Sequence, residues 1–238
     1  MADIEWPRDL SPFRASFFLR PHVGGVESPL TRTRKTYLLS KPVWVCRLSF
    51  RGGWDGEDGK AALGARMDSL IVQMQGGFNR VLLWDFRRPY PVGLRRYYSQ
   101  FSGETYTFAD GRTFSLGERF FVPAEAEPIN ELASAGATSI VFGGFLPGER
   151  TFQTGDYFGG DGRSHIIHTA TVADEDGRTM LTFDPPLQSA LGVGQAITMR
   201  PTTPFKLSTD SAENAGNNDS DVGSDLVEYQ LDFVEDLP

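Results

Sequence analysis

Residues 154–168, TGDYFGGDGRSHIIH, hold the densest group of side chains in this chain that could do chemistry. Asp156, Asp161, His165 and His168 lie within this one segment, and the two histidines are two of only three in the chain. Carboxylates and imidazoles of this kind bind metal ions or transfer protons when a fold brings them to one point. A functional site here therefore requires that these side chains converge.

The spacing of the histidines argues against convergence. His165 and His168 would share one face of a helix, but they lie on opposite faces of a strand. The β-branched residues around them favour a strand that leads into a hairpin. Asp156 and Asp161 flank glycines but lack the spacing of a calcium-binding loop. We predict a glycine-rich turn followed by a strand, with one histidine packed, the other exposed, and no shared metal ion.

The remainder of the chain contains no recognisable catalytic motif, whether a nucleophile elbow, a P-loop or a dinucleotide-binding turn. Glu125 and Glu127 lie between prolines in PAEAEP, which is typical of a solvated loop. The single cysteine, Cys46, lies in the alternating run VWVCRLSF and is expected to be buried, although a histidine brought near it by folding would make it a candidate nucleophile. We predict a protein that is not an enzyme and that uses no cofactor.

Arginine alternates with tyrosine in residues 87–98, RRPYPVGLRRYY. This composition is typical of protein interfaces, which makes an interface the favoured interpretation. A plain surface and a nucleic-acid contact are the alternatives. The interface candidates are Arg87, Arg88, Tyr90, Arg95, Arg96, Tyr97 and Tyr98.

The 238 residues are 39% hydrophobic, which is enough for a folded core. No apolar run reaches the length of a membrane span, and the start MADIEWPRDL lacks the features of a signal peptide. We therefore expect a soluble protein that is made in a cytoplasm, does not span a membrane and is not secreted by the usual route. The net charge of -8 is unevenly distributed, because nine acidic residues and no basic residue follow Leu207. The acidity therefore belongs to the C-terminal segment.

The front of the chain has the pattern of a strand, a helix and a second strand. Residues 43–50 alternate with a period of two, residues 58–77 carry one apolar stripe with helical spacing, and residues 80–86 form a short apolar run. Residues 226–234 again alternate, with Tyr229, Leu231 and Phe233 on one face. Because a lone strand is unstable, we expect this last strand to pair with the early sheet.

Short β-like runs separated by glycine and proline fill residues 90–205, with hairpin signals at Asp110–Gly111 and Asp176–Gly177. Residues 208–225 have almost no apolar content and suggest a flexible, solvated loop. The predicted class is mainly β with one clear helix (α+β). A discontinuous β-rich domain (1–89 and 206–238) would enclose an inserted small β-barrel or β-sandwich module (90–205).

The order of motifs along the chain resembles the distal tail proteins of long, non-contractile-tailed bacteriophages. The likeness begins near residue 40 with the tryptophan-bearing strand and continues with the helix ending in Gly-Gly-Phe and with WDFRRPYPVG. It then follows TGDYF, the histidine-bearing strand, ATVADEDGRTMLTFDPPL, RPTTPFKL and the final YQLDFVEDL. The most specific piece is DPPL after the hairpin.

This resemblance implies a virion structural protein whose belt domain forms a hexameric ring at the lower end of the tail tube. Such a ring joins the tube protein to the hub and to the fibres or receptor-binding proteins used in host attachment, and DNA passes through its lumen. It is assembled in the host cytoplasm and resides at the tail tip of the virion. The alternative is a carbohydrate-binding module that presents Phe152, Tyr157 and Phe158 to a glycan.

Overall fold

The computed structural model describes residues 2–7, 10–53, 61–88, 126–129, 131–214 except 144, 146, 149 and 151, and 226–237. It is mainly β, with 47% strand and 12% helix, which confirms the predicted class. The chain divides into two compact units, Met1–Arg87 with Thr202–Pro238, and Arg88–Pro201. No described helix is long and apolar enough to cross a membrane.

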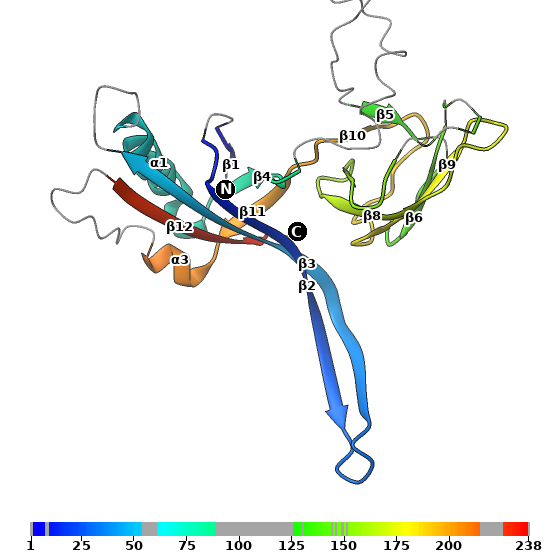
Figure 1. The fold of residues 1–238 in the computed structure, drawn as a ribbon, viewed down its shortest axis with the longest axis horizontal. Coiled ribbons are helices and arrows are strands. Elements are labelled where there is room, and N and C mark those ends of the chain that lie inside the picture. Colours follow the sequence, from blue (N-terminus) through cyan, green and yellow to red (C-terminus); the bar gives the residue numbers. More distant parts are fainter. Residues whose placement is uncertain are drawn as a thin grey trace, which may run out of the picture. The chain divides into compact units, whose positions relative to one another are not determined.

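The first unit is built on one six-stranded sheet (Figure 1). Its strand order is β1 (Asp3–Glu5), β4 (Arg80–Leu83), β11 (Thr203–Leu207), β12 (Leu226–Glu235), β3 (Arg34–Gly53) and β2 (Arg14–Glu27). All neighbours are antiparallel except β1 and β4. The sequence had placed the second boundary after residue 205, whereas β11 lies wholly within this sheet.

Strands β3 and β12 form the centre of the first unit, and they pair over residues 45–53 and 226–234. The alternation predicted for residues 43–50 is confirmed, because Trp44, Cys46, Leu48 and Phe50 are all buried. In β12, Tyr229, Leu231, Phe233 and Glu235 are buried opposite them, and Phe233 pairs with Cys46. The expected return of the C-terminal strand to the early sheet is therefore observed.

The predicted helix is α1 (Ala61–Met74), which continues into a short 3-10 turn, η1 (Gln75–Gly77). Its apolar stripe faces the core, where Met67 and Met74 have no exposed surface. The two glycines end the helix as expected, because both have positive φ, and a Cβ at Gly77 would lie 2.9 Å from the Leu207 carbonyl oxygen.

A second helix, α3 (Thr209–Asn214), corrects the prediction of a single helix and of a flexible loop from residue 208. The hydroxyl of Ser208 accepts a hydrogen bond from the Ser211 N–H at 3.3 Å, which is the geometry of an N-cap. The Ser211 hydroxyl in turn accepts from the Asp232 N–H of β12. The polar composition of this segment gave no helix signal, whereas the serine cap and one tertiary hydrogen bond stabilise the helix. Residues 215–225 lie outside the described residues.

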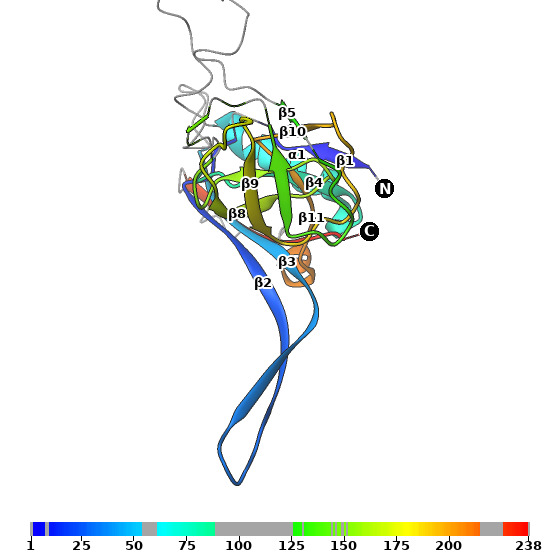
Figure 2. The ribbon, with the colours of Figure 1, turned by 90° about the vertical axis from the view of Figure 1, so that its right-hand side faces the viewer.

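The first forty residues, for which the sequence suggested no element, contain β1, β2 and the first seven residues of β3. Strands β2 and β3 continue past the sheet as a two-stranded ribbon that projects from the first unit (Figures 1 and 2). We call residues 20–41 the arm. Pro21 lies at a register shift of this ladder, where its missing N–H costs no hydrogen bond. No residue of the arm is buried.

The second unit holds a four-stranded sheet and a two-stranded sheet (Figure 2). The first has the order β6 (Ser139–Phe142), β9 (Thr179–Asp184), β8 (His165–Ala170) and β7 (Tyr157–Phe158), and the second pairs β5 (Ala126–Pro128) with β10 (Ala196–Thr198). Gly177 has a φ of 70° in the turn between β8 and β9, as its sequence predicts, but the loop is longer than two residues. The predicted turn at 110–111 lies outside the described residues.

Truncating a core position of β12 tests whether this strand stabilises the first unit. Leu231→Ala removes a side chain that is 1% exposed, and we expect the free energy of unfolding to fall by about 2–5 kcal/mol. The neighbouring Gln230→Ala is the control, since this exposed side chain should change the value by less than about 0.5 kcal/mol. Chemical denaturation measures both. Equal effects of the two substitutions would contradict the burial pattern of β12.

Candidate functional site

His165 and Asp161 form a buried pair in the second unit. The ring Nε2 lies 2.9 Å from Asp161 Oδ1, and Nδ1 lies 2.6 Å from the carbonyl oxygen of Pro185. The ring stacks on Phe158 at 5.0 Å between centroids and meets the edge of Phe183 at 5.1 Å. Because a carbonyl oxygen only accepts, Nδ1 donates to Pro185, and Nε2 lies within hydrogen-bond distance of the carboxyl group.

The surroundings of Asp161 favour its ionised form. Burial alone would raise the pKa of this carboxyl group, but the hydrogen bond and charge of His165 and the backbone N–H of Gln188 outweigh it. The net result is a pKa below the ordinary value of 3.8. The carboxylate thus accepts from both His165 and Gln188, at 2.9 and 2.7 Å. This pair joins the turn to β8 and to the segment after β9.

The other candidates of this segment do not join the pair. His168 is half-exposed and lies 2.8 Å from Asp184, so the two histidines differ in burial as predicted. Asp156 Oδ2 accepts from the Gln153 N–H and closes its own turn. Among the described residues, no group of three or more histidine, cysteine or acidic side chains could hold a metal ion. The arrangement is that of a stabilised turn.

Cys46 is buried on β3, as its alternating sequence predicts. Burial, with a smaller contribution from the charge of Asp85, raises the pKa of its thiol far above the ordinary value. A thiol held in its neutral form is a poor nucleophile. The packing of Cys46 therefore gives no support to a nucleophilic role.

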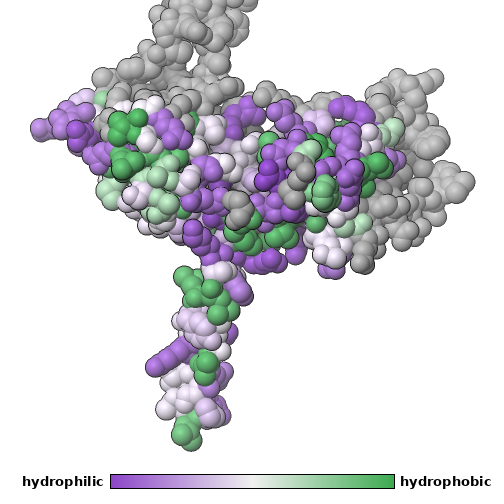
Figure 3. All heavy atoms as spheres, turned by 180° about the vertical axis from the view of Figure 1, so that it is seen from behind, coloured by the Kyte–Doolittle hydropathy of each residue, from purple (hydrophilic) through white to green (hydrophobic). Residues whose placement is uncertain are grey.

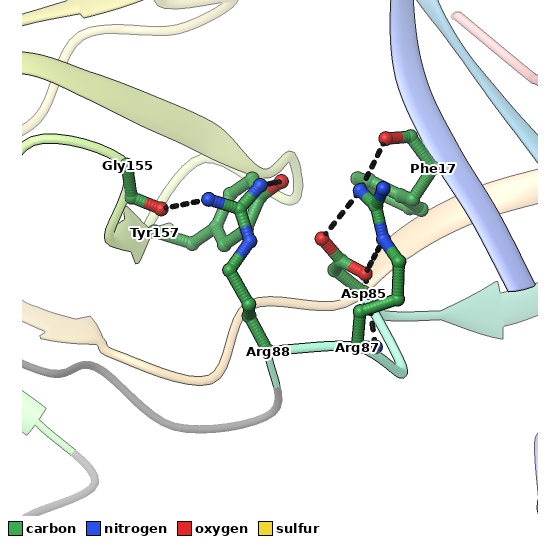
Figure 4. Close-up of polar contacts among 6 residues, drawn as sticks. All are labelled: Phe17, Asp85, Arg87, Arg88, Gly155 and Tyr157. Atoms are coloured by element: carbon green, nitrogen blue, oxygen red, sulfur yellow. Dashed lines mark hydrogen bonds and ion pairs between the residues drawn. The ribbon is translucent and has the colours of Figure 1, made fainter.

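Arg87, the first interface candidate, is bound within the first unit (Figure 4). Its guanidinium donates from Nε and Nη2 to the two carboxylate oxygens of Asp85, each at 2.9 Å. Nη2 also donates to the carbonyl oxygen of Phe17 at 2.7 Å. Since Asp85 is only 4% exposed, this two-pronged ion pair compensates for the burial of its charge.

Arg88, the next residue, is bound within the second unit (Figure 4). Nη1 donates to the carbonyl oxygen of Gly155 at 2.9 Å, and Nη2 donates to the hydroxyl of Tyr157 at 2.8 Å. The guanidinium also lies 5.0 Å from the centroid of the Tyr157 ring, within the range of a cation–π contact. Arg87 therefore binds residues of the first unit, and Arg88, the next residue, binds residues of the second unit.

The other interface candidates, Tyr90, Arg95, Arg96, Tyr97 and Tyr98, lie outside the described residues. Arg87 and Arg88 were singled out from composition as groups that contact another molecule, and the structure gives each of them partners within the chain. Phe17 and Tyr157 lie about 70 residues away in sequence, so local spacing contains no signal for these two partners. Asp85, the main partner of Arg87, is only two residues away.

The three aromatic side chains proposed for glycan contact are core residues. Phe158 has no exposed surface, Phe152 is 3% exposed and Tyr157 is 6% exposed. Phe152 and Phe158 both pack on Phe142 in the core of the second unit. This corrects the choice of these three side chains as glycan contacts, because a buried ring cannot stack on a sugar.

The arm is the most exposed feature of the first unit, and the sequence analysis missed it. Its apolar side chains are spaced from root to tip between hydrophilic ones (Figure 3). Val23, Val26, Leu30, Tyr37, Leu38 and Leu39 are all exposed, and Leu30 at the tip reaches 94%. Several exposed apolar side chains gathered on one projecting element suit an interaction surface.

The arm is shaped for regular pairing despite its two glycines. A Cβ at Gly24 would lie 2.8 Å from Cε2 of Tyr37, which sits opposite it in the register. Only glycine therefore lets this ring lie against the opposite strand, where the ring covers backbone that glycine leaves bare. The glycines that resemble strand breakers in the sequence are part of the ribbon.

No protein-family model matches this chain, and no curated protein matches its sequence. The functional argument therefore depends on the geometry of the arm, the boundary arginines and the buried pair.

The buried pair leads to a prediction about pH. Because the pKa of Asp161 is lower in the folded state than its ordinary value of 3.8, its stabilising contribution is present above that value and is lost as pH falls through the folded pKa. Asp161→Asn should cost about 1–3 kcal/mol at neutral pH, and the difference from the unsubstituted protein should shrink below about pH 3.8. Denaturation curves between pH 2.5 and 7 measure this difference.

The matched control is Asp184→Asn, which breaks the exposed pair with His168. An exposed pair contributes at most about 1 kcal/mol, so this variant should differ little from the unsubstituted protein. A cost of Asp161→Asn that stays constant across the whole pH range would contradict an ionised Asp161.

A further prediction concerns the boundary arginine of the first unit. Arg87→Ala removes the hydrogen bonds from its guanidinium to buried Asp85, and we expect the free energy of unfolding to fall by about 1–3 kcal/mol. Arg51→Ala is the control, because its ion pair with Glu228 is half-exposed on both sides and should contribute at most about 1 kcal/mol. Thermal or chemical unfolding compares them, and an equal loss would show that Arg87 is only a surface charge.

Proposed function

We propose that this chain is a virion structural protein that forms a ring at the distal end of a bacteriophage tail tube. The ring would connect the tube to the hub and to the fibres or receptor-binding proteins, acting by assembly and not by catalysis. The first unit would serve as the belt, and residues 88–201 would form a small β-barrel or β-sandwich module at its periphery. The order of sequence motifs described above suggests this role.

The observation that carries the proposal is the arm. Its 22 residues, 20–41, extend a well-packed sheet into a ribbon whose two faces carry apolar side chains and whose residues all lack burial. Isolated two-stranded ribbons are marginally stable in water, so an arm of this length favours a protein that is completed by neighbours. Assembly proteins need such an element, whereas a monomeric binding module does not.

The chemistry of the described residues offers less to the competing functions. The buried Asp161 and His165 hold a turn together, and the aromatic side chains expected to contact a glycan fill a core. The uneven charge suits a ring around DNA, because an acidic C-terminal segment near the lumen would repel phosphate groups. These features support assembly over sugar binding.

Native mass spectrometry and electron microscopy of the purified protein test the proposal. We expect closed rings of six copies, formed at micromolar concentration without added ligand. Immunogold labelling of virions should place the protein at the tip of the tail. A protein that remains monomeric and is absent from virions would contradict the proposal.

A further inference from the structure

Charge is divided between the arm and the remainder of the chain. The arm carries Arg20, Arg32, Arg34, Lys35 and Lys41 against Glu27 alone. Its net charge is +4, so the remaining residues sum to -12 in a chain whose total is -8. A basic projection thus extends from an acidic protein.

The apolar side chains of the arm lie on both of its faces. Val23 is paired with Leu38 on one face, while Val26 and Tyr37 lie on the other. All four are about half-exposed or more, with Leu38 at 71%. A partner that packs against the ribbon would bury these side chains and would gain from opposite charge.

The ends of the arm show where the self-supporting part of the hairpin stops. Phe17 and Trp44 stack in the core of the first unit with centroids 4.7 Å apart, just inside the pair Arg20 and Val43. Beyond that pair, only ladder hydrogen bonds and cross-strand contacts such as His22 Nδ1 with Ser40 Oγ at 2.9 Å remain. The arm is therefore a separable extension of a sheet that has its own core.

We infer that the arm binds the negatively charged remainder of a second copy of this chain, outside that copy's own arm. Two arms of net charge +4 repel each other, whereas an arm and the acidic remainder of another copy attract. The contact is therefore heterologous, joining two different surfaces, and it leads to a closed ring or a filament instead of a two-fold dimer. The choice of a second copy as partner rests on the proposed ring.

A chain without its arm separates the donor surface from the acceptor surface. Replacing residues 21–42 with Asn-Gly joins Arg20 to Val43, which face each other in the ladder, through a two-residue hairpin turn. The core residues remain, so circular dichroism and thermal unfolding should resemble those of the full chain. Alone, the armless protein should sediment as a monomer. Added to the full chain, it should bind the arms of that chain and shorten or open the assemblies.

The outcomes distinguish this inference from the proposed function. Armless protein that still assembles alone into the ring of the full chain would overturn the role of the arm and leave the ring intact. A full chain that assembles but never binds the armless protein would overturn the heterologous contact. A full chain that stays monomeric at every concentration would overturn both proposals.

Charge reversal provides a second test in a full-length chain. Arg34→Glu with Lys35→Glu should weaken self-association about 10- to 100-fold by fluorescence-detected sedimentation. Arg150→Glu with Arg178→Glu is the control, because both side chains are exposed outside the arm and the net charge changes equally. That control should stay within about threefold of the unsubstituted protein. Equal weakening in both variants would overturn the inference.

Nucleic acid is the competing partner for a basic ribbon, and the same variants test it. A labelled 20-base-pair DNA duplex should show no arm-dependent binding at 150 mM salt. Duplex binding that is lost in the Arg34, Lys35 variant, with self-association unchanged, would assign the arm to DNA and overturn the inference.

Discussion

The hydrogen-bond ladder of β3 is the interaction on which the first unit depends. Along one edge this strand pairs with β12 over residues 226–234, and along the other it pairs with β2. The two ends of the chain are thus joined through a single strand, and the backbone N–H of Trp44 donates to the Glu235 carboxylate at 2.8 Å across that junction. An insertion of more than a hundred residues between β4 and β11 is compatible with this sheet because the two flanking strands pair with each other in it.

The pairing of β2 with β3 extends beyond the hydrophobic core of the first unit. Residues 44–46, 48 and 50 of β3 are buried, whereas residues 34–41 of the same strand are all exposed. Backbone pairing continues through this transition, with register shifts on both sides of His22, but apolar burial stops. The free energy that holds the ribbon must therefore decrease toward the tip. A ribbon without a core of its own changes conformation at a small cost in free energy. This property suits a surface that must fit neighbouring copies.

The parts of the fold that the sequence predicted are those with a local signal. The alternation around Cys46 and Leu231 and the helical stripe through Met67 and Met74 each specify which side chains turn inward, and all four are buried. Strand β2 was missed because Pro21 and the glycine pair imitate a loop, although their ladder partners lie in β3. Likewise, the short helix α3 has a serine cap but no apolar stripe, and its support from β12 is tertiary.

For the functional candidates too, the residue composition suggested one role and the contacts in the fold indicate another. Arg87 and Arg88 look like groups awaiting another molecule, yet one forms an ion pair with a buried carboxylate and the other stacks on a tyrosine of its own unit. The arm looked featureless, yet it is where apolar and basic side chains remain exposed together. A charge whose partner lies in the same fold contributes to stability, and a charge on an uncovered ribbon remains available for binding. The neighbours that folding supplies therefore decide which cluster can act between molecules.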